Sequence, residues 1–178
     1  MIFTGSKVAL RGYSYEDIVV AHKFVNDYEI TKNLALGSIF PVSLDEEEEF
    51  IRKSCARSDD MTCNFAIESL EDGEYIGGCG INETDLKNRN CTVGIFIGEK
   101  ELWGQGYGTD AMEVLIQYAF NELNFEKIKL SVYSFNSRAI KCYANLGFVE
   151  EGQLKKEIFR EGKYHDVILM AMFREDYC

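Results

Sequence analysis

A glycine-rich segment in the second half of the chain limits the choice of fold more than any other feature. It follows the apolar stretch of Ile95, Phe96 and Ile97, and it consists of Trp103, Gly104, Gln105, Gly106, Tyr107, Gly108 and Thr109. Glycines let the backbone approach a ligand closely, and the helix expected after them adds unpaired N–H donors and the positive end of its dipole. A strand, a glycine loop and a helix N-terminus in this order suit a phosphate or pyrophosphate group. A glycine turn without a ligand is the alternative.

Two phosphate-binding motifs do not fit this segment. A dinucleotide-binding fingerprint needs G-x-G-x-x-G, but when the count starts at Gly104 the third glycine position is Thr109. A P-loop needs Gly-Lys followed by Ser or Thr, and the segment lacks this sequence. The spacing therefore disfavours a nicotinamide cofactor and a P-loop nucleotide.

The hydrophobic patterns along the chain predict an α+β protein. Predicted strands cover residues 7–11, 63–69, 74–82, 91–97, 128–132, a segment from 149 onward and 164–173. Predicted helices begin at residues 14–17 and at Ser43, and two more cover residues 109–122 and 137–146. Ser43 and Glu46 have the spacing of a capping box, which would turn Phe50 and Ile51 inward. Strands prevail in the first half, and strands alternate with helices in the second.

The charge balance narrows the class of partner. Lys and Arg number 19 against 30 Asp and Glu, a net charge of −11, and residues 1–90 hold 17 of the acidic residues but only 9 of the basic ones. A nucleic-acid backbone needs a basic surface, so we expect no nucleic-acid partner and favour a cationic substrate. No apolar run reaches the roughly 20 residues that span a bilayer, so we expect a cytoplasmic protein without a membrane partner. The cysteines and two histidines lack metal-site spacing, so we expect no metal.

A second segment gives the glycine loop a context. It comprises Asn136, Ser137, Arg138, Ala139, Ile140, Lys141, Cys142, Tyr143, Ala144, Asn145, Leu146, Gly147 and Phe148. It resembles the second signature of the GNAT N-acetyltransferase superfamily, and the glycine loop resembles that superfamily's acyl-CoA pyrophosphate loop. The later residues Glu151, Gly152 and 162–166 resemble the branch with ribosomal-protein-alanine and spermidine N-acetyltransferases. The resemblance implies one domain over residues 1–178, with a mixed, mostly antiparallel central sheet flanked by helices and a donor-binding core at about 91–150.

The resemblance also assigns roles within the site. It implies that acetyl-CoA binds along Ile95–Ile97, at the loop 103–109, and at Asn136 and Arg138. A backbone N–H at or near Ile97 would steady the developing oxyanion. Tyr143 matches the tyrosine that gives a proton to the leaving thiolate, since a phenol keeps its proton at neutral pH. The alternatives are structural roles without a ligand contact: a core aromatic for Tyr143, a helix cap for Asn136 and a solvated arginine for Arg138.

Two departures from the family pattern concern the proton chemistry. Trp103 stands where the superfamily loop often has Gln or Arg, so the loop is expected to bind through its backbone. Thr92 stands where many relatives carry a carboxylate, which leaves the general base open. We select Glu83, after the second of the central strands, as the candidate base; a loop carboxylate is its alternative. The acidic run at residues 45–49 favours either a solvated first helical turn or a polyamine site.

The sequence therefore predicts an acetyl-CoA-dependent N-acetyltransferase that acts on a primary amine by direct attack. The amine is a protein N-terminus or a small amine. One alternative is a spermidine or spermine N-acetyltransferase, and another is a non-catalytic regulator that binds acyl-CoA. Because dimers are common among proteins of this type, a homodimer or higher homo-oligomer is also an expectation.

Overall fold

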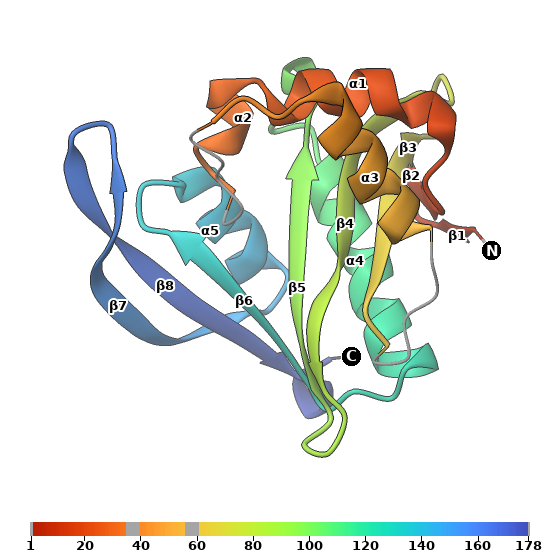
Figure 1. Cartoon of the computed structure of the whole chain (residues 1–178). Coiled ribbons are helices and arrows are strands. Elements are labelled where there is room, and N and C mark those ends of the chain that lie inside the picture. Colours follow the sequence, from red (N-terminus) through yellow and green to blue (C-terminus); the bar gives the residue numbers. More distant parts are fainter. Residues whose placement is uncertain (1, 35–39, 56–60, 178) are drawn as a thin grey trace.

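A mixed eight-stranded sheet runs through the computed structural model of the chain, which describes residues 2–34, 40–55 and 61–177. Its order is β1-β2-β3-β4-β5-β6-β8-β7 (Figure 1). The strands are β1 (Phe3–Thr4), β2 (Val8–Arg11), β3 (Cys63–Ser69), β4 (Tyr75–Asp85), β5 (Asn90–Ile97), β6 (Lys127–Tyr133), β7 (Val149–Arg160) and β8 (Lys163–Phe173). Neighbouring strands are antiparallel except β5 and β6, which are parallel.

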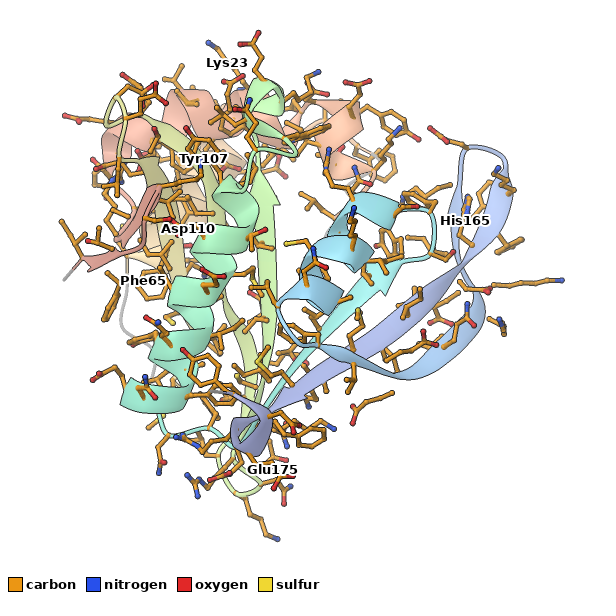
Figure 2. All side chains as sticks on the ribbon, turned by 180° about the vertical axis from the view of Figure 1, so that it is seen from behind. Lys23, Phe65, Tyr107, Asp110, His165 and Glu175 are labelled. Carbon is orange, nitrogen blue, oxygen red and sulfur yellow. The ribbon has the colours of Figure 1, made fainter. Side chains whose placement is uncertain are left out.

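Helices cover both faces of the sheet. They are α1 (Ile18–Val25), α2 (Tyr28–Thr31), α3 (Leu44–Ser54), α4 (Tyr107–Gln117) and α5 (Ser137–Asn145). Short helical turns are η1 (Tyr15–Asp17), η2 (Lys100–Leu102), η3 (Tyr118–Glu122, a π-helical extension of α4) and η4 (Arg174–Asp176). Figures 1 and 2, which view opposite sides, show α1–α3 on one face and α4 and α5 on the other. None of the helices in these described ranges is long and apolar enough to cross a membrane.

Each face of the sheet has its own hydrophobic core, because successive strand residues point to opposite sides. The larger core joins α4 and α5 to the sheet and includes the fully buried Met112, Leu115 and Ile128. The smaller core lies on the face of α1–α3 and is rich in aromatic rings, among them Phe24 and Tyr75, whose centroids are 5.8 Å apart.

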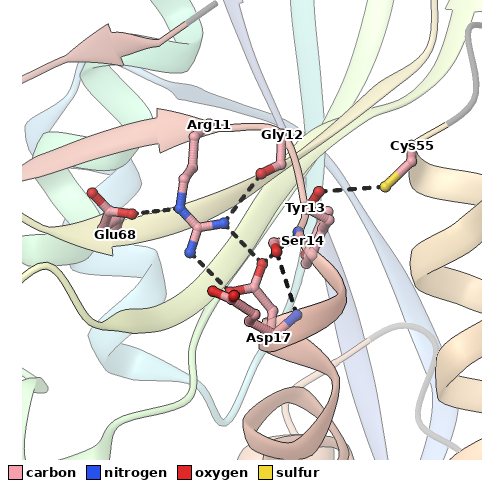
Figure 3. Close-up of polar contacts among 8 residues, drawn as sticks. Arg11, Gly12, Tyr13, Ser14, Asp17, Cys55 and Glu68 are labelled. Atoms are coloured by element: carbon pink, nitrogen blue, oxygen red, sulfur yellow. Dashed lines mark hydrogen bonds and ion pairs between the residues drawn. The ribbon is translucent and has the colours of Figure 1, made fainter.

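A polar network fixes the entry into α1 (Figure 3). The Arg11 guanidinium donates to both carboxylate oxygens of the buried Asp17 at 2.8 Å, and its Nε donates to Glu68. Asp17 also accepts the N–H of Ser14, which completes a capping box around η1. Arg11 thus pairs with two acidic side chains of the first half and balances one of their two charges, and the buried Asp17 is not available to a cationic ligand.

The structure confirms most of the predicted elements and corrects two. The strand at 63–69 and the capping box of Ser43 and Glu46 are as predicted. Phe50, predicted to face inward, is 40% exposed, because Glu47 and Ile51, one helical turn apart, occupy the buried stripe of α3. The helix predicted from Thr109 begins at Tyr107, because Gly106 forms its cap.

Candidate functional site

The strands β5 and β6 separate after a short paired stretch. Only Asn90, Cys91 and Thr92 of β5 pair with β6, where their partners are Lys127, Ile128 and Lys129. Figure 1 shows the two strands diverging toward their C-terminal ends. Beyond Thr92, β5 is paired with β4 alone, and β6 is paired with β8 alone. Residues 93–97 therefore present a free backbone edge to the opening between the strands.

The orientation of the backbone at the end of β5 follows from two hydrogen bonds. The N–H of Gly98 donates to the carbonyl of Ile76 at 2.8 Å, on the side of β4. The carbonyl of Ile97 accepts the indole Nε1–H of Trp103 at 2.7 Å. Because bonding directions alternate along a strand and one residue's N–H and C=O share an edge, the N–H of Ile97 faces the opening. The residue predicted to hold an oxyanion thus carries a suitably directed donor.

The glycine loop leaves the start of α4 open. Gly104 and Gly106 have φ values of 76° and 91°, a left-handed conformation that favours glycine. Gly106 is the N-terminal cap of α4 and supplies no side-chain hydrogen bond. Within the described part of the chain, no hydrogen bond joins the N–H groups of Tyr107, Gly108 or Thr109 to another residue. These amides and the helix dipole are the groups that the predicted anion cradle would use.

The first turn of α4 is anchored by a buried carboxylate. Asp110 accepts the backbone N–H groups of Ser6, Lys7 and Val8 at 2.8–2.9 Å and the Ser6 hydroxyl at 2.7 Å. Burial raises the pKa of Asp110, but these hydrogen bonds together outweigh it and lower that pKa. Figure 2 shows Tyr107 and Asp110 along α4. The same contact brings the Lys7 ammonium to 5.2 Å from the centroid of the Tyr107 ring.

Lys7 is a cation at this site that sequence reasoning missed. Its Cε would lie 3.6 Å from a Cβ built on Gly106, so the lysine stem runs beside the glycine loop. The contact joins residues about 100 positions apart, so no local pattern marks it. Only the hydrogen bonds of Asp110 reveal why this lysine is here.

The second signature segment meets the glycine loop at two points. The Arg138 guanidinium stacks on the Trp103 ring, 3.8 Å from its centroid. The Thr109 hydroxyl and the Cys142 thiol are 3.2 Å apart. Asn136 caps α5, because its side-chain oxygen accepts the N–H of Ala139 at 3.2 Å. The two predicted donor-binding segments therefore form one continuous structure.

Tyr143 is buried on the inner side of α5. It is 8% exposed, and its ring centroid lies 6.0 Å from that of Phe148. Burial raises the pKa of the Tyr143 phenol. The phenol therefore keeps its proton at neutral pH, as a proton donor must. Tyr143 thus occupies the core position given above as the structural alternative, and this position is compatible with the role of proton donor.

Glu83 lies at the closed end of the opening. It pairs with Thr92, the last residue of β5 that is paired with β6. A bulge in β4 between Ile81 and Glu83 leaves Asn82 as the extra residue. Ile97 lies five positions after Thr92, about 16 Å along a strand, so Glu83 and the N–H of Ile97 are not neighbours. The exposed Glu83 does adjoin the position where the family pattern expects a carboxylate.

The bulge also aims Asn82 at Gly94. A Cβ built on Gly94 would lie 2.7 Å from the Asn82 side-chain nitrogen, so the missing side chain makes room for the amide. Sequence reasoning missed Asn82, because only the strand register reveals a bulge at this point. Its amide lies over Gly94, within the part of β5 that does not pair with β6.

The acidic run at residues 45–49 has local partners. Glu46 accepts the Ser43 N–H at 2.8 Å, and Glu49 pairs with Lys53 at 2.9 Å. Glu47 is buried, and burial raises the pKa of its carboxyl. Much of this run therefore serves the helix itself.

Comparison with known proteins adds an independent line of observation. Residues 7–149 match the family described as acetyltransferase (GNAT) domain. An uncharacterized SPbeta prophage-derived N-acetyltransferase of Bacillus subtilis is 31% identical over 98% of this chain and 94% of its own length. The spermidine N(1)-acetyltransferase of Vibrio cholerae is 33% identical over 76% of each chain. A crystal structure of the Vibrio cholerae spermidine N-acetyltransferase with CoA and spermine superposes with a TM-score of 0.84, at 29% identity over 97% of this chain and 98% of that chain.

Proposed function

The chain belongs to the GNAT acetyltransferase family, and on that premise we propose that it transfers the acetyl group of acetyl-CoA to a primary amine of a cationic acceptor. The predictions of a GNAT fold and of an N-acetyltransferase are thereby confirmed. One observation carries the proposal. The free edge of β5 and the open start of α4 border the same opening, so backbone N–H groups can serve both a carbonyl oxygen and a pyrophosphate.

The donor site proposed here uses the backbone more than side chains. Residues 104–109 would hold the pyrophosphate, and the free edge of Ile95, Phe96 and Ile97 would run along the acyl-bearing arm. Asn136 and Arg138, at the start of α5, would flank it from the other side. When bound, acetyl-CoA supplies the thioester carbonyl that the amine attacks. The geometry of the loop supports this donor, since Gly104 and Gly106 allow a close approach that side chains would block.

The reaction needs a donor and an acceptor of protons. The amine nitrogen forms a bond to the carbonyl carbon, and the C–S bond breaks. Tyr143 gives its phenolic proton to the departing sulfur, and the N–H of Ile97 donates to the carbonyl oxygen as negative charge develops there. Glu83 would receive the proton of the acceptor nitrogen through a chain of waters, because its partner Thr92 lies about 16 Å along β5 from Ile97. Its position opposite Thr92 supports this role, because the carboxylate absent from β5 is replaced by one on the adjoining strand.

The acceptor is proposed to be cationic because the first half of the chain carries most of the acidic excess. Relatives named as spermidine N(1)-acetyltransferases support a polyamine. A protein N-terminus is the second candidate, and the similarity to a putative ribosomal N-acetyltransferase of Bacillus subtilis, 29% identical over 61% of this chain, favours it.

An amine panel with detection of the released CoA thiol tests the proposal. The panel contains spermidine, spermine, N-terminal peptides and neutral monoamines. We expect thiol release that is fastest with a cationic amine. If no amine of the panel causes thiol release, although the protein still binds CoA, a non-catalytic regulator is favoured.

Tyr143→Phe tests the assignment of the proton donor. Loss of a general acid typically costs about 100-fold or more in rate, so we expect kcat to fall by about that factor. The affinity for CoA should stay close to that of the wild type, because the ring and its packing against Phe148 remain. An unchanged kcat would remove Tyr143 from the mechanism.

A further inference from the structure

Trp103, the single tryptophan of the chain, joins three parts of the donor site. It directly precedes Gly104, its indole N–H is bonded to the carbonyl of Ile97, and its ring carries the Arg138 guanidinium at 3.8 Å. One side chain thus links the glycine loop, the free edge of β5 and the first turn of α5. It does so at the open end of the separation between β5 and β6.

The Arg138 guanidinium has a geometry suited to an incoming anion. One face lies against the indole, and the residue is otherwise exposed. Partial burial lowers the pKa of Arg138, but a guanidinium stays charged at neutral pH. Within the described ranges, Arg138 forms no ion pair, whereas Lys100 in the nearby η2 turn is bound to Asp27 at 2.7 Å and to Glu29 at 3.0 Å. The charge of Arg138 is therefore available to a ligand, whereas that of Lys100 is already paired with carboxylates.

We propose that Trp103 is a positioning residue that holds Arg138 across the open end of the β5–β6 separation, where the guanidinium binds the phosphates of the donor. Stacking on the indole fixes the plane of the guanidinium and leaves its N–H edges free for phosphate oxygens. The indole bond to the Ile97 carbonyl fixes the ring, and it leaves the Ile97 N–H free for the acyl group. This inference rests on the proposed function, since it takes acetyl-CoA as the donor.

The role of Trp103 differs from that of a loop residue that merely fills space. A space-filling role would affect every donor to the same degree. A positioning role acts through Arg138, so it matters only for donors that carry phosphates. Trp103 and Arg138 should then be energetically coupled, and the coupling should depend on the donor.

A double-mutant cycle with two donors tests the inference. The variants are Trp103→Leu, Arg138→Gln and the double variant, and the donors are acetyl-CoA and S-acetylpantetheine, which lacks phosphates. CoA affinity is measured by calorimetry and kcat/KM with both donors. Trp103→Phe keeps an aromatic face without the indole N–H, and Lys141→Gln removes an exposed cation one turn from Arg138 as the matched control. Thermal denaturation of each variant shows that it folds.

With acetyl-CoA, we expect each single change to lower the affinity about tenfold, as for the loss of one hydrogen bond to a charged group, and the double change to add little. Trp103→Phe should lose less of this affinity than Trp103→Leu, and Lys141→Gln should lose almost none of it. With S-acetylpantetheine, the losses in kcat/KM should be smaller than with acetyl-CoA, and the coupling between Trp103 and Arg138 should disappear. Additive losses, or equal losses with both donors, would overturn the inference while leaving the proposed function intact. Failure of the wild type to bind CoA would overturn both.

Discussion

The helices α3 and α4 have the same length but begin in opposite ways. Both contain 11 residues. At α3, the Ser43 hydroxyl accepts the N–H of Glu46, and the Glu46 carboxylate accepts the N–H of Ser43. At α4, Gly106 stands at the same position with no side chain to offer. The first helix closes its own N-terminus, and the second leaves its amides for something else.

This difference shows how a helix end becomes a binding site. The free N–H groups and the dipole exist at the start of every helix. What distinguishes α4 is the absence of a local acceptor, together with a left-handed glycine that lets a ligand come close. The one carboxylate in its first turn, Asp110, is turned away from the loop and bound by residues 6–8. Substitutions that alter one helix start at a time separate the two roles.

The largest effect is expected from a negative charge placed at the open helix start. Gly106→Asp introduces a carboxylate beside the amides that would face the donor's phosphates, and beside Lys7. We expect CoA affinity to fall about 100-fold, or about 2.7 kcal/mol. Gly106→Asn is the control, because asparagine has the same shape and tolerates a positive φ without charge. Calorimetric titration with CoA measures both, and equal losses would show that backbone strain, not charge, is responsible.

The anchor of α4 is expected to matter next. Asp110→Asn removes a charged acceptor from the donors of Ser6, Lys7 and Val8. We expect the free energy of unfolding to fall by about 2 kcal/mol, since hydrogen bonds to charged groups contribute about 1.5–3 kcal/mol. Because the pKa of Asp110 is lowered in the folded state, its contribution is present above pH 3.8 and is lost as the pH falls through the folded pKa. Urea denaturation at pH 7 and pH 3 should give different losses, and equal losses would contradict the charge argument.

The closed helix start should affect stability but not donor binding. Ser43→Ala removes the cap of α3 at a cost of about 1 kcal/mol, which lowers the Tm of a chain of this size by about 2–4 °C. The affinity for CoA should not change, since α3 lies on the opposite face of the sheet from α4 (Figures 1 and 2). Differential scanning calorimetry and CoA titration test this. A tenfold loss of CoA affinity would erase the distinction between the two helices.

The smallest effect concerns the other half of the capping box. Hydrogen bonds from the Ser43 backbone and hydroxyl lower the pKa of Glu46. A lowered pKa stabilises the folded protein at neutral pH, and this contribution disappears as the pH falls below the usual carboxyl value of 4.5. Glu46→Ala should therefore lower Tm slightly at pH 7 and not at pH 3. The exposed Glu48→Ala is the control, and a shift that persists at pH 3 would speak against the carboxylate.

Much of the fold follows from local patterns. The strand at 63–69, the caps of α3 and α5 and the glycine loop are each encoded by residues within one short segment, so the sequence predicts them directly. The exposed Phe50 shows the limit of such patterns. Helical spacing allowed it to face inward, but packing placed the acidic Glu47 in the buried stripe instead. Local periodicity does not reveal which of two neighbouring stripes the rest of the molecule will cover.

The sequence by itself determined the family, the fold class and the segments of the proposed donor site, because motif spacing and helix capping are short-range properties. The tertiary structure decided which side chains meet there. Asp110 accepts hydrogen bonds from residues 6–8, which precede it by 102 to 104 positions. Trp103 contacts Arg138, and the β4 bulge turns Asn82 toward Gly94. Such contacts depend on strand register and on the packing of two helices against one sheet. No local pattern carries that information, because it arises only when distant segments are brought together.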